Sequence, residues 1–498
     1  MKNNHYKTIL KSTSIVGGAQ LIDILFRIIK NKLLSMLIGP TGMGLINTYQ
    51  TALSLVTTAA GMGVGFSGVR QIAEAEASSD QEKIYKTALT LRRISILFGL
   101  LGVLICLFSS DYLSRFTFGS ADYANPIRIL SLFIFFEIVT SGQTALLQGT
   151  RRIADLARVT IWGSVFGLCV GVPLIYFFRY QGIVPLIILL AVVKMGTSWW
   201  YARKIRIEQT GISWRETLRL GTSFVQLGFA FMLSGFATML AQYLIKVIAI
   251  NKLGIEAVGI YMASNVISVL YIGIILDAMG KDYYPRLTGI IEKPAQVIQL
   301  INEQIEIGIA LALPGLLATL TFAPLLVYFF YTAAFSQADD ILRWQILGIY
   351  LRVISWPMAY YYVAKGKGKV FLLMEIIFAA AHVLLAWFGV LLFGLAGLGI
   401  AFCVLYIFYT AYNYVLLHHT IQFVWSAEVK NILTFSVFAI GITFLILLQA
   451  PPTTGYLTGA IATLGASWYT IKKLMVILEI TELSQLVPLL KNKFRKHA

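Results

Sequence analysis

Charged side chains are scarce in this chain, and their scarcity sets the class of protein. Asp, Glu, Lys and Arg make up 13% of the 498 residues, whereas a soluble protein carries about 25%. Apolar runs recur along the whole chain, many of them near the ~20 residues that a transmembrane helix needs. An ordinary soluble fold is therefore excluded. The sequence predicts an all-α polytopic membrane protein, because a lipid-exposed backbone must satisfy its hydrogen bonds within each helix.

Cysteine and acidic residues are also few. The three cysteines fall inside apolar segments without a nearby partner, so we predict no disulfide framework and no metal site. Only 23 acidic residues oppose 40 basic ones, which gives a net charge of +17. That charge could indicate a nucleic-acid partner, but the Lys and Arg residues gather in short loops, as in membrane proteins. We predict contact with the membrane and none with nucleic acid, and a C-terminal "KNKFRK" tail that lies on anionic lipid headgroups.

The apolar pattern predicts about fourteen transmembrane helices, with both termini on one side of the membrane. Loops rich in Lys and Arg, such as the one holding Arg151 and Arg152, alternate with loops such as "GPTG" and "GLAG" that have none. The basic loops are expected to be cytoplasmic, together with both termini. The predicted spans are 12–38, 43–68, 89–110, 126–147, 155–178, 183–201, 218–249, 255–277, 303–330, 341–363, 370–392, 395–417, 431–449 and 456–478.

A weak internal repeat divides the chain. "IGPTGMGLINTYQTALSL" (38–55) aligns with "LGIEAVGIYMASNVISVL" (253–270), and "ALLQGTRR" (145–152) falls opposite "YYVAKGKGK" (361–369), at an offset of about 215 residues in both cases. Six helices per half keep the halves parallel, which is a transporter architecture with the substrate path between two lobes. We predict an N-terminal lobe at 1–210, a C-terminal lobe at 211–420, and two additional helices with the basic tail at 421–498.

Charged residues interrupt the first predicted helix. Asp23, Arg27 and Lys30 follow a spacing of i, i+4, i+7 and share one helix face, where Asp23 can pair with Arg27. Two interpretations stay open: a structural ion pair inside the bundle, or the wall of a wet cavity on a transport path. Lys32 lies on the opposite face, nearer the outer end, where a lysine can extend to the membrane surface.

Further polar residues lie at membrane depth in other predicted helices. Glu137 and Arg352 occupy equivalent places in the two halves, so a partnership across the lobes and separate packing roles are both open. Lys246 is near an outer helix end, and His382 is either a packing histidine or a proton-handling residue. Uncharged polar stripes on two helices bind helices together or line a path for a hydroxyl-rich substrate. These stripes include Asn47, Gln50, Tyr261 and Asn265.

Several stretches together resemble a known family, over roughly residues 10–417. They are "IGPTGMGLINTYQTALSLVTTAAGMGVGFSGVRQIAEA", "ALLQGTRR", "VGIYMASNVISVLYIGI" and "RWQILGIYLRVISWPMAYYYVAKGK". The sequence is similar to the Wzx-type O-antigen and lipid III flippases of the multidrug/oligosaccharidyl-lipid/polysaccharide exporter superfamily. The resemblance implies a MATE-like fold with two lobes around a central cavity, in the bacterial cytoplasmic membrane. It also implies alternating-access transport of an undecaprenyl-pyrophosphate-linked oligosaccharide. An O-unit polymerase and a chain-length regulator are the protein partners that such a transporter would meet.

With that substrate, the polar residues acquire expected roles. Cations would grip pyrophosphate or acidic sugar, acids would balance charge or couple to an ion, and amides and hydroxyls would meet sugar hydroxyls. The candidate substrate-binding residues are Arg27, Lys30, Asp23, Arg352, Asn47, Gln50, Tyr261, Asn265, Lys246 and Lys32. The candidate ion-coupling residues are Asp23, Glu137 and His382.

Three alternatives to this function stay open. Two helices follow the twelfth, as in the lipid II flippases, where extra helices form a groove for the lipid tail. A drug/cation antiporter of the same superfamily would require acidic residues in its cavity and fewer cationic ones. A membrane-embedded polysaccharide polymerase or ligase would need catalytic residues on a large outer loop, and the outer loops here are short. We expect no enzymatic activity and no cofactor.

Overall fold

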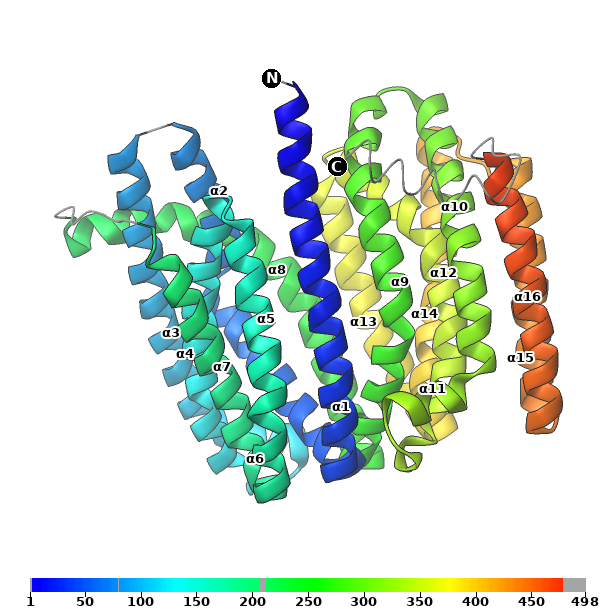
Figure 1. Ribbon diagram of the computed structural model, residues 1–498, viewed down its shortest axis with the longest axis horizontal. Helices are drawn as coiled ribbons and strands as arrows, with labels where there is room; N and C mark the ends of the chain where they lie inside the picture. Colours follow the sequence, from blue (N-terminus) through cyan, green and yellow to red (C-terminus); the bar gives the residue numbers. More distant parts are fainter. Residues whose placement is uncertain (1, 79, 206–211, 478–498) are drawn as a thin grey trace. The chain divides into compact units, whose positions relative to one another are not determined.

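The computed structural model describes residues 2–78, 80–205 and 212–477, and every element in them is helical (Figure 1). The helices before residue 254 are α1 (Lys2–Gly61), α2 (Val64–Ala77), α3 (Gln81–Phe118), α4 (Ala124–Gly149), α5 (Ile153–Cys169), α6 (Gly171–Phe178), η1 (Arg179–Gly182), α7 (Ile183–Ala202) and α8 (Trp214–Leu253). Those after it are α9 (Ile255–Ile290), α10 (Pro294–Thr321), α11 (Ala323–Phe330), η2 (Ala333–Phe335), α12 (Ala338–Ala364), α13 (Gly368–Phe393), η3 (Gly394–Ala396), α14 (Gly397–Ile421), α15 (Ala427–Gln449) and α16 (Pro452–Ile477).

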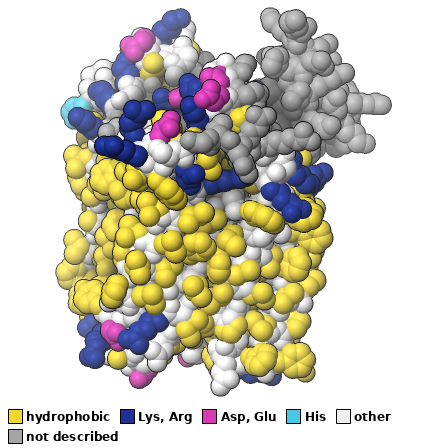
Figure 2. Space-filling view, turned by 90° about the vertical axis from the view of Figure 1, so that its left-hand side faces the viewer, with side chains coloured by type: hydrophobic (Ala, Val, Ile, Leu, Met, Phe, Trp, Pro, Cys, Tyr) yellow, Lys and Arg dark blue, Asp and Glu magenta, His cyan; other side chains and the backbone are white. Residues whose placement is uncertain are grey.

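The predicted spans lie on these helices except for short turns at residues 62–63, 170 and 322. Residue 478 and the basic tail lie outside the described residues. Among the described residues, eight helical segments are long and apolar enough to cross a membrane. Two of them, of 50 and 54 residues, each hold two predicted spans, because the chain turns at η1 and at η3. Figure 2 shows a broad hydrophobic band on one face of the molecule, with Lys and Arg gathered above and below it. The prediction of an all-α polytopic membrane protein is confirmed.

Local sequence signals account for several helix ends. Asp80 and Ser213 cap α3 and α8 by accepting hydrogen bonds from the backbone N–H groups of Lys83 and Glu216, each at 3.2 Å. Gly39 interrupts α1 with φ 58° and ψ −167°, a conformation that only glycine adopts readily, and so separates the first two predicted spans. A second break, between α1 and α2, bends the chain by 47°.

The backbone repeats itself at the spacing found in the sequence. Six of the ten described residues with positive φ form three pairs separated by 215 positions (254 − 39, 366 − 151 and 394 − 179), and these pairs are Gly39 and Gly254, Arg151 and Gly366, and Arg179 and Gly394. Left-handed backbone costs an ordinary L-residue about 1–2 kcal/mol, so random coincidence of three pairs is a poor explanation. The two halves therefore share a backbone plan, and the predicted repeat is confirmed.

Two glycines at equivalent positions of the repeat lie in a close backbone contact. A side chain on Gly44 would collide with the carbonyl of Ile255, and one on Gly259 would collide with the carbonyl of Pro40. Both partners are again 215 positions apart (259 − 44 and 255 − 40). The start of the second half of α1 and the first turns of α9 thus meet backbone to backbone, because neither glycine carries a side chain.

The described residues separate into two compact units, one that ends at Gly259 and one that begins at Ile260. In the first unit, α8 packs against α1, α2 and α3, around buried residues that include Ile72, Leu91 and Leu147. In the second, α10 packs against α12, α15 and α16, and α13 against α14. Because α8 lies in the first unit, this division differs from lobes of 1–210 and 211–420, which stay a prediction; the boundary at 210 is outside the described residues.

Candidate functional site

The charged stripe of α1 lies along α5. Asp23 forms an ion pair with Arg27 and accepts a hydrogen bond from the Ser164 hydroxyl of α5. Lys30 reaches the same helix, with its Nζ about 4 Å from the place where a side chain of Gly167 would begin. The predicted pair of Asp23 and Arg27 is confirmed. Asp23 is 15% exposed and Arg27 60%, so the arginine is the member of the stripe that remains open to a ligand.

Lys246 is the most deeply enclosed cation among the described side chains of the first unit. It lies on α8 and is 5% exposed, so it does not extend to a surface. Its amine donates a hydrogen bond to the hydroxyl of Thr51 on α1, whose own hydroxyl donates to the Asn47 carbonyl at 2.8 Å. No described carboxylate forms an ion pair with Lys246. A buried ammonium without a counter-ion is costly, which marks it as a place where an anion would be stabilised.

Glu137 has its partner inside the first unit. Its carboxylate on α4 accepts two hydrogen bonds from Lys194 of α7, at 2.8 and 3.0 Å. Gln143 and Ser198 connect the same two helices a short distance along. The structure therefore pairs Glu137 with Lys194 of the same unit.

Arg352 lies in a second polar cluster, among α12, α13 and α14. It interacts electrostatically with Glu375 and with Tyr406, and the Tyr409 hydroxyl donates to Glu375 at 3.2 Å. Arg352 and Tyr409 lie 215 positions after Glu137 and Lys194, respectively. The two units thus hold polar clusters at equivalent positions, with an acid on α4 where α12 has a cation.

The remaining candidates are scattered. Tyr261 on α9 is 7% exposed, while Asn265 on the same helix is half-buried. His382 packs its ring 6.0 Å from that of Phe402. Gln50 and Lys32 are half-buried on α1. These residues do not converge on one described cavity.

Sequence reasoning missed the partners that complete these clusters. Ser164, Thr51 and Lys194 are 141, 195 and 57 positions from the residues they contact. Tyr409 could have been found by applying the repeat spacing to Lys194, but no local pattern connects Ser164 with Asp23. No described group of three or more His, Cys, Asp or Glu residues could hold a metal ion.

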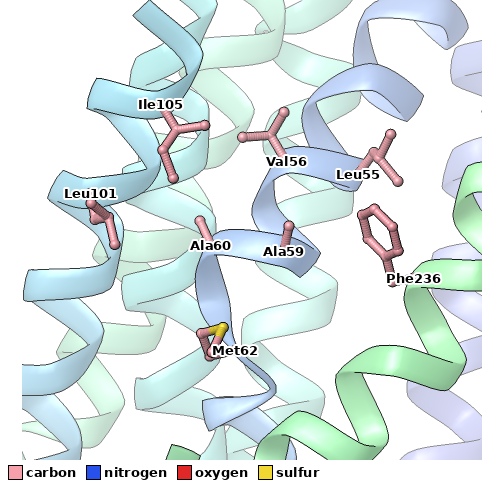
Figure 3. Close-up of a pocket in the computed structure, with 8 residues that line it drawn as sticks. All are labelled: Leu55, Val56, Ala59, Ala60, Met62, Leu101, Ile105 and Phe236. Carbon is pink, nitrogen blue, oxygen red and sulfur yellow. The ribbon is translucent and has the colours of Figure 1, made fainter. Parts of the chain in front are cut away.

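Two cavities of the first unit are apolar. One of about 330 Å³ lies where α1, α3 and α8 meet; Figure 3 shows Leu101 and Ile105 on one side of it and Phe236 on the other. The second, of about 730 Å³, is bounded by α4, α6 and α7 and includes Ile129 and Leu189. Neither is lined by a predicted site residue, so the polar clusters and these hydrophobic spaces are separate features.

Long apolar helices with enclosed polar clusters define an all-α polytopic membrane protein. The fold resembles a multidrug MATE family transporter in an inward-facing conformation, with a TM-score of 0.67 and 19% identity over 80% of this chain and 94% of that one. It also resembles the lipid II flippase MurJ in an inward closed conformation, with a TM-score of 0.68 and 14% identity over 92% and 99%. These likenesses establish a MATE-like fold.

Sequence comparison gives the family. A profile described as "Polysaccharide biosynthesis protein" matches residues 33–340, and the chain belongs to that family. The "Lipid III flippase" of Escherichia coli (strain K12) is 21% identical over 376 residues, which are 74% of this chain and 88% of the relative. A "Putative O-antigen transporter" of Shigella flexneri is 24% identical over 380 residues, or 74% and 87%.

Proposed function

We propose that this protein is a flippase that moves an undecaprenyl-pyrophosphate-linked oligosaccharide from the cytoplasmic to the periplasmic leaflet by alternating access. A pyrophosphate with a polar glycan cannot cross hydrocarbon unaided, because its charge and hydroxyl groups would lose their hydration. A transporter for it must offer cations and hydrogen bonds in place of water. The family and the names of the relatives support this assignment.

One observation carries the proposal: cations inside the helices outnumber their acidic partners. Among the described side chains, no carboxylate lies within ion-pairing distance of Lys30, Lys246 or Arg352, although Asp23 acts electrostatically on Lys30 and Glu375 on Arg352. An anionic headgroup would supply the missing negative charge, and charge-assisted hydrogen bonds to it would offset the cost of burying these cations. A transporter of cationic drugs would need the opposite balance.

The proposed roles follow from the environment of each residue. Arg27, Lys30 and Arg352 hold pyrophosphate or an acidic sugar, with Lys246 and Lys32 as further cations. Asn47, Gln50 and Asn265 meet sugar hydroxyls, and Tyr261 joins them in a conformation that exposes it. Asp23 and Glu137 balance charge and, with His382, are the candidates for ion coupling.

The proposed setting is the bacterial cytoplasmic membrane, with the Lys/Arg-rich loops and both termini in the cytoplasm. The lobes are 1–210 and 211–420, and a polymerase and a chain-length regulator act on the exported unit. These assignments depend on charge distribution and family, and reporter fusions at the loops would test the orientation.

Export of surface polysaccharide tests the function. In a strain that depends on this chain, Arg352→Ala and Lys246→Ala are expected to reduce export at least tenfold at unchanged protein level. Arg128→Ala is the matched control, because Arg128 is an exposed arginine that pairs with Asp111. Normal export in both site variants would refute the assignment.

A lipid II flippase is the second candidate, favoured by α15 and α16. These helices pack against α10, with Lys473 ion-paired to Glu306 at 3.0 Å, and extend the chain beyond twelve spans. If the chain restores peptidoglycan synthesis and restores no other polysaccharide, the lipid II alternative is correct.

A further inference from the structure

One face of α12 carries a cation followed by two aromatic rings. Arg352, Trp356 and Tyr360 are spaced i, i+4, i+8, so they follow one another along the helix over about 12 Å. The rings of Trp356 and Tyr360 are in contact, with centroids 4.4 Å apart. Tyr284 of α9 adds a third ring, edge-on to Tyr360 at 6.1 Å.

The aromatic rings are held in place from behind. Tyr283 is fully buried, and its hydroxyl donates to the Pro357 carbonyl at 2.7 Å, which fastens α9 to α12. Gly280 lies against the ring of Trp356, where even a Cβ atom would be only 3.2 Å from the indole. The Trp356 ring is therefore positioned by packing on one side.

The same rings remain open on the other side. Trp356 and Tyr360 are half-buried, and Tyr284 is 39% exposed. A core cluster would be closed on all sides, as Tyr283 is. Three rings that are fixed in orientation and partly uncovered form a surface that a ligand can stack on.

Charges at both ends indicate that this surface faces water and not lipid. Arg352 lies one turn before Trp356, and the exposed Asp277 of α9 interacts electrostatically with Tyr360. An exposed carboxylate and a guanidinium beside hydrocarbon would be strongly unfavourable.

The chemistry of this face matches a sugar. A pyranose ring has faces of C–H groups, which are attracted to the negative face of an aromatic ring, and a rim of hydroxyls. Tyrosine hydroxyls and the Asp277 carboxylate can bond that rim, while Arg352 can form paired hydrogen bonds to a phosphate or a carboxylate. We propose that Trp356, Tyr360 and Tyr284 form a carbohydrate-binding subsite, with Arg352 at one end for the negative charge and Asp277 at the other for hydroxyls.

This inference rests on the proposed function, so its test separates the sugar from the pyrophosphate. The purified chain in nanodiscs is titrated with two probes: farnesyl pyrophosphate, and farnesyl pyrophosphate that carries one N-acetylglucosamine. Trp356→Ala is expected to weaken binding of the sugar probe about tenfold, equivalent to ~1.4 kcal/mol, and to leave binding of the bare probe unchanged. Arg352→Ala should weaken both.

Conservative variants and a distant aromatic residue serve as controls. Trp356→Phe and Tyr360→Phe keep a ring and should retain most of the affinity for the sugar probe, whereas Tyr360→Ala should lose it. Trp468→Ala removes an exposed indole of α16 and should change neither affinity.

The outcomes distinguish the two proposals. If Trp356→Ala binds both probes as the wild type does, the subsite is refuted and the proposed function stands. If the wild type binds the sugar probe but not the bare one, binding of the pyrophosphate by the cations is refuted and the subsite stands. Failure of the wild type to bind either probe refutes both.

Discussion

Gly44 and Gly259 each lie against the backbone that precedes the other, and the two contacts are related by the repeat of 215 positions. The contact works only because both residues lack a side chain. It brings the second half of α1 and the start of α9 together just after Gly39 and Gly254, both of which have positive φ. Equivalent glycines of the sequence repeat are thus in contact in the structure.

Replacing either glycine should destabilise the protein. A Cβ at Gly44 or Gly259 would collide with backbone carbonyls, which cannot move as a side chain can, so Gly44→Ala and Gly259→Ala are expected to cost about 1–3 kcal/mol. Thermal unfolding in detergent measures the effect. Gly441→Ala is the control, because Gly441 is mid-helix in α15 with open space around it. That variant should be equally or slightly more stable, and a similar loss in all three would contradict the contact.

Removal of the Lys246 charge should separate stability from function. The amine is buried against a hydroxyl, so Lys246→Met is expected to unfold at the same or a higher temperature, since an uncompensated charge is removed. Export should nevertheless fall at least tenfold if the amine meets an anion. Thr51→Val, which removes the hydrogen-bond partner but keeps the charge, should retain more export than Lys246→Met. Full export by Lys246→Met would remove this residue from the site.

The pair of Glu137 and Lys194 can be tested by a double-mutant cycle. Glu137→Gln and Lys194→Gln should each reduce stability, and the double variant should lose less than the sum, with a coupling of about 0.5–3 kcal/mol. Glu137→Gln combined with Arg352→Gln should be additive. Coupling with Arg352 and none with Lys194 would reverse the assignment of partners.

The sequence predicts the features that depend on local helix geometry and on the lengths of the apolar runs. Apolar runs locate the helices, and the spacing of Asp23 and Arg27 predicts their ion pair, because four residues make about one helical turn. The sequence also predicts the repeat offset of 215 positions. Gly39 and Gly254 are equivalent in it because each provides a left-handed backbone where a helix breaks.

Contacts between helices that are distant in the chain cannot be predicted from the sequence pattern. Which face of α5 meets Asp23, and whether Lys246 reaches a membrane surface or turns inward to Thr51, depend on how whole helices pack. The aromatic face of α12 illustrates the same point. Its i, i+4, i+8 spacing is present in the sequence, but only the packing of Tyr283 and Gly280 shows that one side of the rings stays open.

The central claim is tested most directly by lipid movement in proteoliposomes that contain the purified chain. A fluorescently labelled undecaprenyl-pyrophosphate oligosaccharide is supplied in one leaflet, and its arrival in the other is followed over time. The wild type and Arg128→Ala should move it at the same rate, and Arg352→Ala and Lys246→Ala at least tenfold more slowly. Movement no faster than in protein-free vesicles, or equal rates for all four proteins, would contradict the account.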